Sequence, residues 1–124
     1  MKNNFIDLFA GIGGFHLAIH VEDWDCVYAS ENDKYARETY KKNFKNISPS
    51  IFNSQLFNND ILKADPKKIP NHNLLCAGFP CQPFSQAGYK KGFSEKLEDR
   101  GNMFFVIRDI IAKKRPDAIF LENV

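Results

Sequence analysis

The stretch that decides the fold is Phe5-Ile6-Asp7-Leu8-Phe9-Ala10-Gly11-Ile12-Gly13-Gly14, close to the start of the chain. Its first half is a short apolar run that suits a buried β-strand, and its second half is a glycine turn. The next residues include Phe15, Leu17, Ala18 and Ile19, which suit the buried face of a helix turn. A strand, a glycine loop and a helix in this order predict the first unit of an open α/β sheet.

The rest of the chain continues the alternation of strands and helices. Apolar runs predict further strands over residues 25–30, 54–58, 74–77 and 117–121. Helical spacing predicts helices over residues 33–44 and 102–115, the second of which stops at Pro116. Connections are predicted over residues 46–53 and 66–70, and a long mobile loop over residues 86–100. The pattern therefore predicts one α/β domain with a mostly parallel sheet.

Composition narrows the class of protein. The chain has 124 residues, enough for one domain with its own core. Its three cysteines form no C-x-x-C pair and are not clustered with its three histidines, so neither a disulfide framework nor a metal site is predicted. No run approaches the roughly 18 apolar residues of a membrane helix, and the polar start lacks a secretory segment. We therefore expect a cytoplasmic protein in a reducing setting, with no membrane partner.

Charge is distributed unevenly along the chain. Residues 1–31 contain five acids and one base, a net charge of −4, whereas the whole chain carries +2, which leaves +6 for residues 32–124. A surface of this kind permits binding to a polyanion such as nucleic acid, although mildly basic surfaces are more often simply solvated. Charge alone therefore does not establish a DNA partner.

The glycine loop favours one kind of cofactor over another. The dinucleotide pattern G-x-G-x-x-G would need a glycine at position 16, where the chain has His16, so NAD is disfavoured. Glu31 ends the next predicted strand, where an acid can accept hydrogen bonds from ribose hydroxyls. The acidic surroundings and the lack of a lysine in the loop favour a cationic adenosine ligand such as S-adenosylmethionine. The alternative is a glycine turn that only lets the strand pack on the helix.

A second stretch, Gly78-Phe79-Pro80-Cys81-Gln82-Pro83-Phe84-Ser85, indicates a nucleophile. It follows a predicted strand, and chemistry in open parallel sheets gathers outside the carboxyl ends of the strands. Pro80 and Pro83 fix the backbone on either side of Cys81 and keep the loop out of a strand or helix. We expect Cys81 to be reactive, and Cys26 and Cys76 to be small buried hydrophobes.

These two stretches, together with Glu122-Asn123-Val124, resemble the N-terminal motifs of DNA (cytosine-5) methyltransferases. Glu31, Asn59-Asp60-Ile61 and Asp99-Arg100-Gly101 also fall where that family places cofactor-binding and loop-closing residues. The resemblance covers essentially the whole chain, residues 1–124. It implies that the chain is the N-terminal part of a catalytic domain with a Rossmann-like, S-adenosylmethionine-dependent methyltransferase fold, truncated after the fifth strand.

The resemblance also implies a cofactor site. Glu31 would hold the ribose, and Asp60 and Ile61 would contact the adenine. The residues bordering the methionine part and lining the same pocket would be Phe9, Ala10, Gly11, Ile12, Gly13, Gly14, Gly78 and Pro80. Two positions depart from common family choices, because Asn32 replaces an aromatic after the ribose acid and Asn73 replaces an acid before the fourth strand.

The implied reaction follows from residue chemistry. Cytosine C5 is a weak nucleophile, so a thiolate of Cys81 adds at C6 and C5 then takes the methyl group. Glu122 is expected at N3, where a shared proton would relieve negative charge on the base. The family resemblance further implies that the partner is double-stranded DNA with the target cytosine flipped out, contacted by Gln82, Ser85 and Arg100.

Family members continue with further catalytic residues, a target-recognition domain and a C-terminal segment that completes the pocket. One expectation is therefore a second polypeptide that supplies these parts. The alternative is a truncated, inactive fragment that at most binds S-adenosylmethionine. A third possibility is a small thiol enzyme or a nicotinamide-binding module outside this family.

Overall fold

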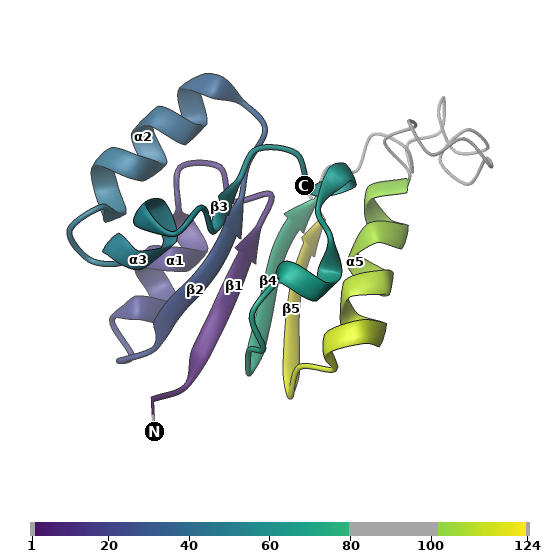
Figure 1. Cartoon of the computed structure of the whole chain (residues 1–124). Helices are drawn as coiled ribbons and strands as arrows, with labels where there is room; N and C mark the ends of the chain where they lie inside the picture. The colour runs from purple at the N-terminus through teal and green to yellow at the C-terminus, as the bar shows by residue number, and fades with distance from the viewer. Residues whose placement is uncertain (1, 80–101, 124) are drawn as a thin grey trace.

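A computed structural model describes residues 2–79 and 102–123 of the chain. Five strands form one sheet in the order β3-β2-β1-β4-β5, and every neighbouring pair is parallel (Figure 1). The strands are β1 (Asn4–Leu8), β2 (Asp25–Ser30), β3 (Phe57–Asn58), β4 (Leu74–Phe79) and β5 (Ala118–Asn123). The predicted parallel α/β sheet is therefore confirmed.

Helices cover both faces of the sheet, as parallel strands require. One face packs against α1 (Gly14–His20), α2 (Lys34–Phe44) and α3 (Pro49–Asn53), and the other against α5 (Asn102–Lys114) and two short 3-10 turns (Figure 1). These turns are η1 (Ile61–Lys63) and η2 (Pro66–Lys68). A separate cluster of buried apolar side chains lies on each face of the sheet.

The central strand β1 is buried on both faces, which explains its near-continuous apolar sequence. Phe5 belongs to the cluster beneath α2, whereas Ile6 and Leu8 belong to the cluster beneath α5. Asp7 interrupts the run, although its side chain is as fully buried as those of its neighbours. A carboxyl group in the middle of a core strand needs a physical explanation, because burial of an unpaired charge is strongly unfavourable.

Two predictions on the α1 and α2 side were wrong. Residues 46–53 were predicted as a connection, yet α3 forms there, because Pro49 occupies the first turn without losing a hydrogen bond and Ile51 is buried in the core. The predicted buried face of α1 included Leu17 and Ala18, which are exposed, whereas His16 is the fully buried residue. Hydrophobicity misassigned this face because the core beneath α1 contains polar partners for an imidazole.

Smaller differences concern the ends of elements. The predicted strand over residues 54–58 is reduced to Phe57–Asn58, while β4 and β5 extend to Phe79 and Asn123. Asp33 lies just before α2 as its N-cap, where its carboxylate accepts a hydrogen bond from the Ala36 amide. The predicted loop over residues 86–100 lies outside the described residues. Within the described ranges, no helix is both long enough and apolar enough to cross a membrane.

Candidate functional site

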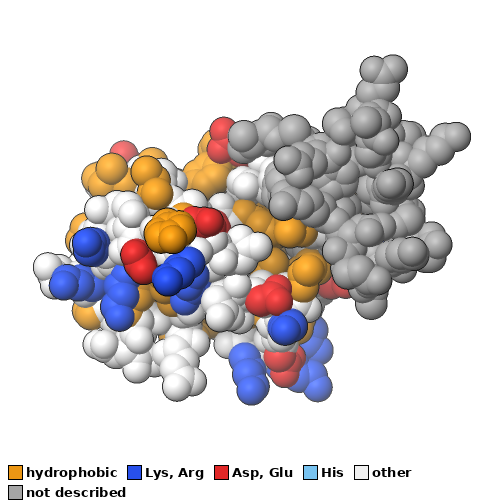
Figure 2. Space-filling view, turned by 90° about the horizontal axis from the view of Figure 1, so that it is seen from above, with side chains coloured by type: hydrophobic (Ala, Val, Ile, Leu, Met, Phe, Trp, Pro, Cys, Tyr) orange, Lys and Arg blue, Asp and Glu red, His pale blue; other side chains and the backbone are white. Residues whose placement is uncertain are grey.

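Because the five strands are parallel, their carboxyl ends lie at the same end of the sheet. The direction of chain progression reverses there between the neighbouring strands β1 and β4. From β1 the chain passes to β2 on one side, whereas β4 leads to β5 on the other. Ligands of open α/β sheets bind at such a switch point, outside the carboxyl ends of the strands. Figure 2 views the molecule from this end and shows apolar, acidic and basic side chains meeting near the middle of the described surface.

The glycine loop, residues 9–14, follows β1 directly and turns sharply at the switch point. Phe9, Gly11 and Gly13 have positive φ angles of 54°, 59° and 103°, which accounts for two of the glycines. The Ala10 amide donates to the Ser30 carbonyl at 2.9 Å and thereby fixes the loop to the end of β2. The sequence therefore forms a loop whose shape depends on glycine at defined positions.

Part of this loop faces open space. A Cβ atom built at Gly11 or at Gly14 would meet no atom within 4 Å. Packing within the described residues therefore requires glycine at neither position, and at Gly11 only the positive φ requires it. The lack of a side chain at both positions leaves the backbone accessible to a bound molecule, as a site that recognises ligands through main-chain groups requires.

Glu31 is fixed immediately beside the loop. Its carboxylate accepts one hydrogen bond from the Gly11 amide at 2.8 Å and another from the Asp33 amide at 2.8 Å, one on each oxygen. Each carboxylate oxygen can accept a second hydrogen bond, so the group retains capacity for ligand hydroxyls. The predicted ribose acid and the predicted glycine loop are thus brought together in the structure.

The Arg37 side chain braces the backbone behind Glu31. Its guanidinium donates to the carbonyl oxygens of Glu31 at 2.8 Å and Asn58 at 2.7 Å, and it lies 4.1 Å from the centre of the Phe57 ring. This arrangement joins the end of β2 to the end of the short edge strand β3. Arg37 was not identified from the sequence, because nothing in the spacing of residues in α2 indicates that this side chain donates to the backbone at the ends of β2 and β3.

The two residues predicted to contact adenine follow β3. The Asp60 carboxylate caps η1 by accepting a hydrogen bond from the Leu62 amide at 3.0 Å. Ile61 is largely within the core beneath α5 and is only 6% exposed. A hollow of about 400 Å³ lies nearby, with Asn32 and Asn59 in its lining. The role of Asp60 and Ile61 remains a prediction.

On the other side of the switch point, Glu122 lies beside β4. Gly78 pairs with Glu122 across the two strands. A Cβ atom built at Gly78 would lie 3.8 Å from Glu122 Oε2, 3.7 Å from the Phe15 ring and 4.0 Å from the Phe9 carbonyl. The ends of β1, β4 and β5 therefore converge around Gly78, and the carboxylate predicted to serve catalysis is within this group.

Several predicted site residues lie outside the described residues: Pro80, Cys81, Gln82, Ser85 and Arg100. Their roles stay predictions. The two other cysteines, Cys26 and Cys76, are buried and unbonded to other sulfurs, as predicted. Burial raises the pKa of the Cys76 thiol to about 12, with a smaller contribution from Asp7, and raises that of Cys26 further. Neither supplies a thiolate near neutral pH.

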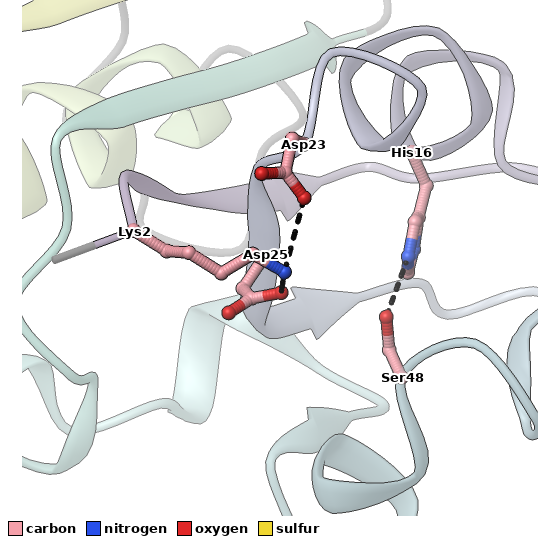
Figure 3. Close-up of polar contacts among 5 residues, drawn as sticks. All are labelled: Lys2, His16, Asp23, Asp25 and Ser48. Carbon is pink, nitrogen blue, oxygen red and sulfur yellow. Dashed lines mark hydrogen bonds and ion pairs between the residues drawn. The ribbon is translucent and has the colours of Figure 1, made fainter.

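A polar network beneath the loop was also missed. Asp7, His16, Tyr40 and Ser48 are joined by hydrogen bonds in the core, and Figure 3 shows the contact between His16 and Ser48. One feature of the sequence indicated it, because position 16 is polar among apolar neighbours. From the sequence alone, His16 was interpreted only as evidence against an NAD fingerprint.

Among the described residues, no group of three or more histidine, cysteine or acidic side chains could hold a metal ion.

The same view shows Lys2 paired with two carboxylates near the start of β2. Lys2 lies 3.2 Å from Asp23 and 3.3 Å from Asp25, and all three side chains are about half exposed or more (Figure 3). Exposed pairs of this type contribute little to stability, because water already solvates both charges. These two ion pairs join Lys2 to the start of β2, at the opposite end of the strands from the glycine loop.

Comparison with known proteins gives a consistent result. The chain is 47% identical over 120 residues to the type II methyltransferase M.HhaI of Haemophilus parahaemolyticus, and 48% identical over 121 residues to M.NlaX of Neisseria lactamica. These matches cover 97% and 96% of this chain but 33% and 35% of the relatives. The chain therefore spans about a third of the length of these curated relatives.

Solved structures show the same fold. The crystal structure of S. pombe Dnmt2 methyltransferase superposes with a TM-score of 0.70 at 24% identity, covering 99% of this chain and 36% of that one. A Spodoptera frugiperda DNMT2 mutant gives a TM-score of 0.70 at 26% identity, with 99% and 36% coverage. The family model described as C-5 cytosine-specific DNA methylase matches residues 3–124. The chain thus belongs to the C-5 cytosine-specific DNA methylase family.

Proposed function

We propose that this chain provides the cofactor-binding and nucleophile part of an enzyme that methylates C5 of cytosine in DNA. The observation that carries the proposal is the 2.8 Å hydrogen bond between the Gly11 amide and the Glu31 carboxylate. It places the open glycine loop and an acid with spare acceptor capacity side by side at the switch point. Family membership makes S-adenosylmethionine the ligand to be tested there.

The residues present fit such a cofactor. The open backbone at Gly11 and Gly14 would accommodate its methionine part, and the Glu31 carboxylate would accept hydrogen bonds from its ribose. Asp60 would bind the edge of its adenine, with Ile61 beneath. The Glu31 carboxylate suits a cationic ligand better than a polyphosphate, whose negative charge it would repel. When bound, the cofactor supplies an electrophilic methyl group.

The remaining chemistry is assigned to two side chains. The Cys81 thiolate forms a covalent bond with cytosine C6, which raises electron density at C5 so that this carbon can accept a methyl group. Loss of the C5 proton then allows the bond between sulfur and C6 to break and restores the ring. Glu122, beside Gly78, would share a proton with N3 and limit the charge that develops on the base.

Cytosine C6 is inaccessible within stacked DNA, so the base must be flipped out at an energetic cost of a few kcal/mol. We assign Gln82, Ser85 and Arg100 to contacts with double-stranded DNA that offset this cost. These three residues lie outside the described residues, so the assignment follows from their positions in the family motifs.

We further propose a second polypeptide that supplies target recognition and completes the catalytic domain. In the described part of the chain, β5 pairs with β4 alone, and its apolar residues Ile119, Phe120 and Leu121 are 49%, 53% and 38% exposed. An edge strand with three exposed apolar residues is a surface that proteins normally cover. The alternative is an inactive fragment that binds S-adenosylmethionine only.

Titration calorimetry tests the cofactor site. The parent chain should bind S-adenosylmethionine, and Glu31→Gln should bind about tenfold more weakly, because the charged acceptor for the ribose is lost. Glu22→Gln, an exposed substitution outside the loop, is the matched control and should bind as the parent does. Equal affinities for the parent and Glu31→Gln would contradict the assignment of Glu31.

DNA containing 5-fluorocytosine tests the chemistry, because fluorine at C5 cannot leave as a proton does. The chain mixed with the remaining two thirds of a relative, and with S-adenosylmethionine, should form a covalent adduct on a denaturing gel. Cys81→Ser should abolish the adduct, and Cys76→Ala should retain it. An adduct formed by Cys81→Ser would exclude Cys81 as the nucleophile, whereas the absence of any adduct from the parent mixture would favour the inactive fragment.

A further inference from the structure

Four polar side chains form a continuous hydrogen-bonded network in the core beneath the glycine loop. The His16 ring contacts the Tyr40 hydroxyl through Nδ1 at 2.7 Å and the Ser48 hydroxyl through Nε2 at 2.9 Å. The Tyr40 hydroxyl in turn donates to Asp7 Oδ2 at 3.1 Å. Asp7, His16 and Tyr40 are fully buried, and Ser48 is nearly so. The network connects β1, α1, α2 and the residue that precedes α3.

The direction of these hydrogen bonds determines the tautomer of His16. When the Tyr40 hydroxyl donates its single proton to Asp7 Oδ2, its oxygen is left to accept a proton from His16 Nδ1. Nε2 is then unprotonated and accepts from the Ser48 hydroxyl, the contact visible in Figure 3. Burial lowers the pKa of His16 to about 4, which is consistent with a neutral ring. The ring plane is thus fixed from both of its nitrogen atoms.

The fixed imidazole lies flat against Phe44. The two ring centres are 3.9 Å apart and their planes differ by 7°. Phe44 in turn fills the space beside Gly13, since a Cβ atom at that position would lie 2.0 Å from Phe44 Cε2. Gly13 is also the N-cap of α1 and has a φ of 103°. The second half of the glycine loop therefore packs directly on the stacked pair.

The first half of the loop depends on the same contact. The Gly13 amide donates to the Ala10 carbonyl at 3.0 Å, which closes the turn that contains Gly11. The Gly11 amide then reaches the Glu31 carboxylate at 2.8 Å. A shift of Phe44 would displace Gly13 and with it the turn, so the position of the Gly11 amide follows from the orientation of the His16 ring.

We propose that His16 is a positioning residue for cofactor binding, which it supports by fixing Phe44 and thereby the glycine loop. The inference that the glycine loop binds a cofactor rests on the proposed function. The contact of His16 with Phe44 does not depend on that function. His16 itself does not touch the open side of the loop, because its ring is enclosed within the core. Its effect is therefore transmitted through Phe44 and Gly13.

The test compares His16→Leu with a control of similar instability. Ile69→Ala removes buried apolar volume from the cluster on the opposite face of the sheet, so it destabilises the fold without touching the network. Both variants are studied at a temperature where urea unfolding shows them to be folded. Hydrogen exchange of the Gly11 amide is measured by NMR, and the affinity for S-adenosylmethionine by calorimetry.

We expect His16→Leu to accelerate exchange of the Gly11 amide and to weaken S-adenosylmethionine binding, each by about tenfold. Ile69→Ala should change neither by more than about twofold. A third variant, His16→Gln, can restore both polar contacts but not the stack, and should behave like His16→Leu. In the parent chain, the ¹⁵N shift of His16 should report protonated Nδ1 and unprotonated Nε2.

Unchanged Gly11 exchange in His16→Leu would overturn the inference, as would equal effects in Ile69→Ala. Parent-like exchange and affinity in His16→Gln would also overturn it, because the stack on Phe44 would then be unnecessary. If the parent chain bound no S-adenosylmethionine while Gly11 exchange still depended on His16, the proposed function would fail. His16 would then remain the residue that positions the loop.

Discussion

The buried carboxyl group of Asp7 should make stability depend on pH in an unusual direction. Burial raises the pKa of Asp7 to about 8, an effect opposed by the Tyr40 hydrogen bond and reinforced by the negative charge of Glu31. Its Oδ1 atom has no hydrogen-bond partner among residues 2–79 and 102–123. The folded chain therefore retains a proton that the unfolded chain, with an ordinary pKa of 3.8, has already released. Stability must fall as the pH rises between these two values.

His16 acts in the opposite direction over part of this range. Burial, with a smaller contribution from His20, lowers its pKa from 6.5 to about 4. Between these values the unfolded chain binds a proton that the folded chain does not, so this residue makes stability rise with pH. The two slopes have similar size, about 1.4 kcal/mol per pH unit for each group. They should therefore cancel between pH 4 and pH 6.5.

Above pH 6.5 only the contribution of Asp7 remains. From there to pH 8, where Asp7 in the folded chain begins to lose its proton, the free energy of unfolding should decrease by about 2 kcal/mol. Urea unfolding at intervals of half a pH unit from pH 5 to pH 8.5 measures this directly. Asp7→Asn, which cannot titrate, should lack the decrease, whatever its stability at pH 6.

The difference between the parent and Asp7→Asn is the decisive quantity. It should change by about 2 kcal/mol between pH 6.5 and pH 8 and little beyond pH 8.5. A constant difference over this interval would mean that Asp7 is already ionised in the folded chain, and the argument from burial would be refuted. Comparing the two variants also removes contributions from other groups that titrate in the same interval.

Two further predictions concern residues around the loop. Gly13→Ala should reduce the free energy of unfolding by about 3 kcal/mol, because the added Cβ would overlap Phe44 and the φ of this position is 103°. Urea unfolding measures this change. Gly14→Ala is the control, because its Cβ would meet no atom within 4 Å. Arg37→Lys should reduce the free energy of unfolding by about 2 kcal/mol, because a lysine cannot donate to the carbonyl oxygens of Glu31 and Asn58 as the forked guanidinium does. An unchanged free energy of unfolding would show that these contacts of Arg37 are dispensable.

The sheet could be predicted because its strands differ sharply from their surroundings. The strand β2, residues 25–30, has the predicted bounds, because a strand buried on both faces has a nearly continuous apolar sequence. The helix α5, residues 102–114, ends within one residue of its predicted end, because Pro116 stops the helix. The short strand β3 was less predictable. It contributes two residues, and its position depends on contacts with Arg37 that lie far away in the sequence.

The site was predicted in part for the same reason. Gly11 and Glu31 were identified because a glycine turn and a strand-end acid each have a local signature, and the structure joins them by a hydrogen bond. The connection from His16 to Ser48 spans α1 and the start of α3, so no local pattern contains it. Helix spacing assigned His16 to no face, because a polar residue in a core is explained only by its tertiary partners.

The network is also an inefficient way to stabilise a core. In the described part of the chain, one oxygen of the Asp7 carboxyl group has no partner, and apolar residues of similar volume would avoid this penalty. Apolar packing, however, would not fix one orientation of a ring against Phe44, because it lacks directional contacts. If the network exists for orientation, replacing its buried polar groups together, as in Asp7→Leu/His16→Leu/Tyr40→Phe, should raise stability above pH 6.5 while accelerating exchange of the Gly11 amide. Stability and loop order would then change in opposite directions, an outcome that a purely structural role for these residues does not produce.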